Sequence, residues 1–249
     1  MLNKVPEVTV YFWLIKVLAT TVGETAADFL NEHVGLGLTG TSIVAGALLA
    51  VVLAVQFAKR RYVPSVYWLA VVLISIVGTL ITDNLTDNFG VSLITTTIVF
   101  SAALAATFAV WYAVERTLSI HTIVTTRREA FYWLAILFTF ALGTAAGDLI
   151  AERFALGYWQ SAVLFGSVIA LVALAHYRFG LDAVTAFWAA YVLTRPLGAS
   201  IGDFLSQPVP DGGLGVGTTT TTVLFLLAIV SFVAYLTVTR RDRTPVAMA

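Results

Sequence analysis

"WLIKVLATTVGETAAD" (residues 13–28) lies within an apolar run long enough to span a membrane and yet carries three charged side chains, Lys16, Glu24 and Asp28. Charged groups are costly inside a bilayer, where they usually face a bundle interior or a water-filled cavity. In this stretch a Gly follows the Trp by ten residues and an Asp follows it by fifteen. The same register recurs at 68–83, 133–148 and 188–203. It predicts four related helices, each with an acidic residue at a similar depth.

Composition places the chain among helical membrane proteins. Of its 249 residues, 59% are hydrophobic and 11% are charged, whereas soluble domains average about 45–50% apolar and about 25% charged residues. The formal net charge is zero and no basic stretch is present, which argues against a nucleic-acid partner. The absence of cysteine excludes disulfides and thiolate metal sites.

Apolar runs between polar residues predict eight transmembrane helices in one polytopic domain, residues 1–249. We expect the first span to be retained and not removed as a signal peptide, since no small-residue cleavage site follows "MLNKVPEV" (residues 1–8). The expected cores are 8–30, 41–58, 65–86, 93–114, 130–151, 159–177, 183–205 and 219–239.

Basic residues sort to one side of this topology, from Lys4 to Arg243, and Arg153 alone falls on the other side. The positive-inside rule therefore predicts that both termini lie in the cytoplasm. The expected location is the bacterial cytoplasmic (inner) membrane.

The four copies are spaced by 55, 65 and 55 residues, which suggests a two-helix hairpin duplicated twice. The approximate repeats are 8–60, 63–117, 128–178 and 183–241. Each contains an even number of spans, so the repeats are parallel and related by an axis along the membrane normal. The predicted fold class is all-α membrane, with the four repeats in a pseudo-fourfold arrangement. Small residues permit close helix approach, so we expect the four odd-numbered spans at the centre, through Gly23, Gly78, Gly143 and Gly198.

The chain resembles a bacterial integral membrane protein family built from four tandem "repeats of unknown function", each with two transmembrane segments and a characteristic tryptophan. The resemblance covers Val8 to Arg241 and is carried by four tryptophans with their following Gly and Asp. It implies this architecture and no particular activity. The tryptophans are Trp13, Trp68, Trp133 and Trp188.

The four aspartates are the first candidates for a functional site. At 1.5 Å per residue, fifteen residues place each Asp roughly 22 Å beyond its Trp, in the outer third of a bilayer about 30 Å thick. Four acids at one height would form a ring that attracts cations. The alternative is that each Asp only satisfies backbone groups at a helix end. The aspartates are Asp28, Asp83, Asp148 and Asp203.

Three charged residues break the fourfold pattern. Glu24 lies four residues before Asp28, on the same helix face, and this pair is a candidate proton carrier. Arg195 precedes Pro196, which frees a backbone carbonyl, and it can meet Glu24 if the first and last repeats are neighbours. Lys16 is expected to extend to the cytoplasmic interface.

Three even-numbered spans open with glycine and hydroxylated residues, at 35–42, 90–97 and 213–222. Broken helix starts with free N–H groups could contribute to a substrate site. The alternative is that these segments are ordinary turns leading to Ser or Thr helix caps.

The favoured function is a secondary transporter for a small cation, with possible proton coupling, and not an enzyme. Oxygen ligands without cysteine favour a hard divalent metal such as Mn²⁺, carried as substrate with no resident cofactor. The proposed binding, proton-coupling and metal-ligating residues are Glu24, Asp28, Asp83, Asp148 and Asp203, together with Arg195 for binding or coupling. Four alternatives stay open: a small anionic or zwitterionic solute, a cation channel, a membrane enzyme and an assembly factor. The expected partners are the lipid bilayer and a small ion or solute, and homo-oligomer formation is left open.

Overall fold

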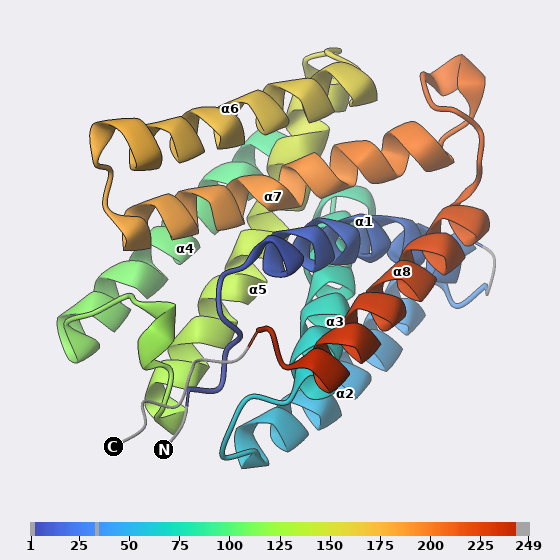
Figure 1. The fold of residues 1–249 in the computed structure, drawn as a ribbon. Coiled ribbons are helices and arrows are strands. Elements are labelled where there is room, and N and C mark those ends of the chain that lie inside the picture. Colours follow the sequence, from blue (N-terminus) through green and yellow to red (C-terminus); the bar gives the residue numbers. More distant parts are fainter. Residues whose placement is uncertain (1–2, 33–34, 243–249) are drawn as a thin grey trace, which may run out of the picture.

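The computed structural model describes residues 3–32 and 35–242, so Arg243 lies outside the described residues. Within them the chain is all-helical, with eight α-helices of 20 to 24 residues and no strand. The number of helices confirms the sequence-based expectation (Figure 1). The helices are α1 (Val10–Glu32), α2 (Gly37–Ala58), α3 (Pro64–Asp83), α4 (Leu93–Glu115), α5 (Thr126–Asp148), α6 (Tyr158–Phe179), α7 (Ala183–Ser206) and α8 (Thr218–Thr239).

Four short helices connect or extend the long ones. Two are π-helices, η1 (Asn84–Asn88) directly after α3 and η3 (Leu149–Arg153) directly after α5. The other two are 3₁₀ turns, η2 (Ile120–Thr122) and η4 (Val209–Asp211).

Six of the eight long helices are apolar enough to cross a membrane, with mean hydropathy of 1.7 to 2.3 over their most apolar stretch. The other two are α1 and α7, which are equally long. Both carry charged residues in their interior, among them Glu24 in α1 and Arg195 in α7. These two helices pack against each other, so the least apolar helices of the chain share an interface.

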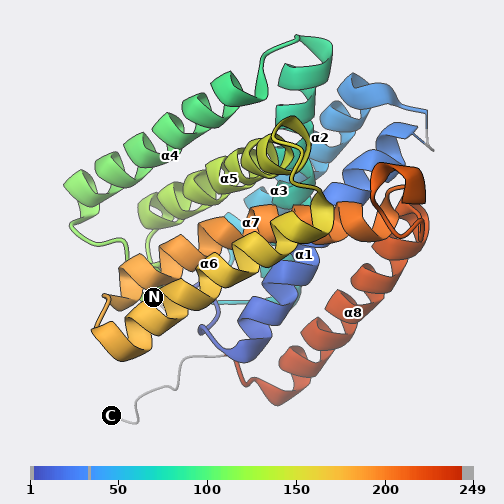
Figure 2. The same ribbon diagram turned by 90° about the horizontal axis from the view of Figure 1, so that it is seen from above.

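The odd-numbered helices form a closed cycle of contacts. α1 packs against α3, α3 against α5, α5 against α7, and α7 against α1. The even-numbered helices lie outside this cycle (Figure 2). Most of their large apolar side chains are exposed, as expected of surfaces that face lipid.

Each even helix packs mainly against the odd helix that follows it in the chain. α2 contacts α3, α4 contacts α5, α6 contacts α7, and α8 contacts α1. The two helices of one predicted repeat, such as α1 and α2, are therefore not each other's main packing partners. Each odd helix uses one face for the central cycle, and its remaining face takes the even helix of the preceding copy.

Four glycines, ten residues after each Trp, lie where neighbouring odd helices meet. A side chain at Gly23 would overlap Ser75, and one at Gly78 would overlap Phe140. A side chain at Gly198 would overlap Thr20. Each partner stands seven residues after the next Trp in the cycle, so one contact recurs at successive interfaces. Close approach of this kind requires glycine.

Gly143→Ala is expected to destabilise the protein, because the new Cβ would lie 2.5 Å from the Arg195 Cβ and 3.1 Å from the Pro196 Cδ. Overpacking of this kind costs roughly 1–3 kcal/mol. Thermal unfolding of the purified protein in detergent measures the effect. The matched control is Gly46→Ala in α2, where no heavy atom lies within 4 Å of the added Cβ. Equal midpoints for the two variants would contradict the close approach.

The N-terminal segment closes one end of the bundle. The Lys4 ammonium is 4% exposed and lies 2.6 Å from Glu129 of α5. It also donates to the Phe57 carbonyl at 3.0 Å, while the Gln56 amide donates to Glu129 at 3.0 Å. Lys4 therefore joins the N-terminus to the end of α2 and the start of α5.

The C-terminal segment meets the same end. The Glu7 N–H donates to the Asp242 carbonyl at 2.9 Å, and the Tyr62 hydroxyl donates to the Asp242 carboxylate at 2.6 Å. Burial raises the pKa of the Tyr62 phenol, and the nearby Asp242 charge adds to the rise. The phenol therefore stays protonated and able to donate. The two ends of the described chain are thus held side by side (Figure 1).

Candidate functional site

Arg195 links all four odd helices. Its guanidinium is fully buried and donates to the Glu24 Oε2 of α1 at 2.6 Å. It also donates to the Thr144 Oγ1 of α5 at 2.6 Å and to the Thr79 Oγ1 of α3. All three acceptors stand eleven residues after their Trp. The expected pairing of Arg195 with Glu24 is confirmed.

Lys16 is buried inside the ring of odd helices. Its side chain is fully buried, and its Nζ has no hydrogen-bond partner among the residues that the structure describes. The Nζ lies 4.2 Å from the centre of the Tyr191 ring and 4.3 Å from that of Phe140. The expectation that Lys16 extends to the interface is wrong, because two aromatic faces inside the bundle receive the group instead.

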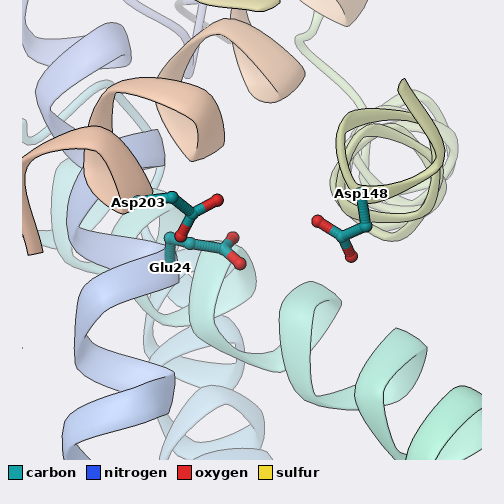
Figure 3. Close-up of side chains that lie close together, drawn as sticks. All are labelled: Glu24, Asp148 and Asp203. Atoms are coloured by element: carbon teal, nitrogen blue, oxygen red, sulfur yellow. The ribbon is translucent and has the colours of Figure 1, made fainter. Parts of the chain in front are cut away.

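Three carboxylates converge beside Arg195. One oxygen each from Glu24, Asp148 and Asp203 lies within 4.8 Å of the others (Figure 3). Glu24 is 6% and Asp203 is 7% exposed, and Asp148 is half-buried. The three residues come from α1, α5 and α7. We call this group the carboxylate triad. Because hard cations take oxygen ligands, the triad has the donor set for such an ion.

The other two predicted acids lie outside the triad. Asp28 in α1 and Asp83 at the end of α3 are half-buried. Asp83 lies within electrostatic range of Glu24 and Asp28, and Asp28 also has interactions of its own. The structure therefore brings three of the five predicted acids together and places the remaining two nearby.

None of the four aspartates is itself the N-cap residue of a described long helix. Asp28 and Asp203 stand within α1 and α7, and the helix continues past both. α3 and α5 pass directly into π-helices after Asp83 and Asp148. A π turn inserted in a helix often marks a functional position, and here two of the four copies have one at the predicted acid.

Of the three hydroxylated starts of even helices, only that of α4 makes a side-chain helix cap. Ser92 caps α4 by accepting the Thr95 N–H at 3.1 Å. α2 is already helical from Gly37, so 35–42 is not a break in the helix. Thr222 of α8 donates to Thr25 of α1 at 2.8 Å. The capping interpretation is therefore confirmed for α4, while the N-cap residues of α2 and α8, Leu36 and Gly217, make no side-chain cap.

A mostly apolar cavity lies apart from the triad. It has a volume of about 540 Å³ and lies between α1, α6, α7 and residues 118–121. Its lining is mostly apolar and includes Trp13 and Phe187, while neither Arg195 nor any triad residue contributes. Because the charged groups are elsewhere, the cavity does not define the site.

The four repeats match a known protein family. A family model described as "Repeat of Unknown Function (DUF347)" matches residues 11–62, 66–117, 131–181 and 186–242. The chain belongs to this repeat family. Each family match covers one odd helix and the even helix that follows it. No curated protein and no solved structure matched the chain.

Within the family repeats, two threonines at the site escaped the sequence analysis. Thr79 and Thr144 are equivalent to Glu24 in their own repeats, and both accept from Arg195. Their position eleven residues after the Trp of each repeat could have identified them, because side chains at one height around a ring of helices can reach the same central group. The Lys4–Glu129 pair gave no such signal, since its members lie 125 residues apart and outside the repeated register.

Proposed function

We propose that the protein is a secondary transporter for a small hard cation, with a divalent metal such as Mn²⁺ favoured. The observation that carries the proposal is the carboxylate triad, in which oxygens from three helices lie within 4.8 Å of one another. Buried carboxylates within a membrane bundle are costly and are usually functional. The triad would hold the metal as cargo, while Asp28 and Asp83 would form the approach to it.

The spacing of the triad suits an ion after a small contraction. Hard divalent metals sit at about 2.1 Å from oxygen, so adjacent ligand oxygens are about 3 Å apart. The triad oxygens are separated by up to 4.8 Å, and side-chain rotation can close this difference. Water would complete the coordination shell, as it commonly does for Mg²⁺-like ions.

A carrier fits better than a channel. Arg195 is fully buried among the odd helices and contacts the triad residue Glu24 at 2.6 Å. A fixed positive charge along a cation-conducting pore would oppose conduction. A carrier needs only alternating access to the triad. The second candidate substrate is a small anionic or zwitterionic solute, which is favoured by Lys16, whose amine has no hydrogen-bond partner in the described chain.

The proposal includes a topology. All eight helices would cross the bacterial inner membrane with both termini in the cytoplasm, and the four repeats would be related by a pseudo-fourfold axis. Support comes from the basic residues on one side and from the closed cycle of odd helices. The burial of charge in α1 and α7 within that cycle supports a transmembrane position for these two helices as well.

Asp203→Asn and Glu24→Gln are each expected to lower Mn²⁺ uptake by about tenfold or more, because each removes a ligand of the hard ion. Uptake into liposomes that contain the purified protein is the measurement. The matched control is Asp211→Asn, which neutralises an exposed acid in η4. Normal uptake by both triad variants, with the proteins folded, would refute the proposed site.

A further inference from the structure

Arg195 pairs with Glu24 and so affects the charge of the carboxylate triad when no ion is bound. Both side chains are almost completely sealed from solvent, and the pair is joined at 2.6 Å. A buried carboxylate left without a positive partner is strongly destabilising. We propose that Arg195 is the internal counter-ion of the unloaded triad, so that the empty carrier reorients and net transport proceeds without obligatory exchange. This inference rests on the proposed transport function.

Arg195 would keep other hydrogen-bond acceptors if it released Glu24. Its guanidinium also donates to Thr79 and Thr144, and it lies 3.5 Å from the Thr20 carbonyl. These acceptors belong to three different helices and carry no charge. When a cation binds Glu24, the guanidinium therefore keeps hydrogen-bond partners at its present position.

Glu24 is arranged to serve both partners. Within the described part of the chain, its side-chain hydrogen bonds all go to Oε2, from Arg195 and from Thr79. The second oxygen, Oε1, is left for an ion held with Asp148 and Asp203. Arg195 is thus a positioning residue, which acts through Glu24 and does not itself contact the cargo.

The charge of Arg195 explains why it would control the reorientation of the carrier when no ion is bound. Glu24 and Asp203 are the two most buried carboxylates of the site, and Arg195 neutralises the first. If the empty site keeps a buried charge without a counter-ion, the carrier reorients that site slowly between the two sides of the membrane, because charge is poorly solvated inside the bilayer. Such a carrier would move its site quickly only when loaded, and would therefore exchange one ion for another.

The test compares net entry with exchange. Entry of radioactive Mn²⁺ is measured in liposomes that are either free of metal or preloaded with unlabelled Mn²⁺. For the wild type we expect the two rates to agree within about threefold, because Arg195 offsets the buried Glu24 charge when the site is empty. For Arg195→Gln we expect net entry to fall by about tenfold or more, with exchange changed by less than about threefold. Arg195→Lys keeps the charge and should retain both rates.

The outcomes separate the two proposals. A wild type that needs preloaded metal overturns the counter-ion inference, whether or not any variant folds. Equal slowing of net entry and exchange by Arg195→Gln also overturns it, since that pattern indicates a structural role. If the wild type carries no Mn²⁺ in either assay, the proposed function itself fails.

Discussion

Glu24→Ala is expected to lower the free energy of unfolding by roughly 3–5 kcal/mol, because it leaves the Arg195 guanidinium buried without its counter-ion. The variant keeps the Thr79 and Thr144 contacts of Arg195, and neither of these partners carries charge. Thermal unfolding in detergent, followed by tryptophan fluorescence, measures the loss.

The control for this prediction removes both charges. Replacement of a buried pair by apolar residues is often neutral, so Glu24→Ala combined with Arg195→Met should recover most of the lost stability. A double variant no more stable than Glu24→Ala would show that the pair is not coupled. That result would also weaken the counter-ion role, which depends on the same charge pairing.

Glu129→Ala is expected to release the N-terminal segment from the end of the bundle. The Lys4 ammonium would keep only the Phe57 carbonyl, and burying it unpaired would cost roughly 3–5 kcal/mol. Because Lys4 stands near the end of the chain, the segment can move into water while the helices stay folded. Local opening of this kind is measured by hydrogen exchange.

The amides to follow are Glu7 and Tyr62, which donate to Asp242 and Asn3 in the closed arrangement. Their exchange should accelerate by about 100-fold or more in Glu129→Ala, because the local stability is lost. The matched control is Asp211→Asn, which neutralises an exposed acid in η4, away from this segment. Unchanged amide exchange in Glu129→Ala would contradict the proposed anchoring role of Lys4.

Much of the fold could be predicted from the Trp, Gly and Asp register. Hydrophobic length gave eight helices, and the glycine positions pointed to contacts between odd helices, where a side chain at Gly23 or Gly198 would now overlap its neighbour. The register fixes the height of a residue along a helix and the face it occupies. It does not specify which helix packs against that face, so the packing of α2 on α3 could not be derived.

The candidate site was predictable in part for the same reason. Glu24 and Arg195 stood out because they departed from the repeated pattern, and they do meet. The direction of Lys16 could not be read from the sequence, since a long side chain can reach either the interface or the interior. The aromatic rings that receive it belong to α5 and α7, far away in the chain.

The packing of each even helix on the following copy has an evolutionary consequence. Each even helix packs mainly on the odd helix of another copy, and the last copy covers the first through α8 and α1. A one-copy ancestor would therefore have exposed an uncovered helix face unless several chains exchanged helices, in the manner of a domain-swapped oligomer. Gene duplication and fusion would then have joined such subunits into one polypeptide, in which α8 covers α1 as one subunit once covered the next.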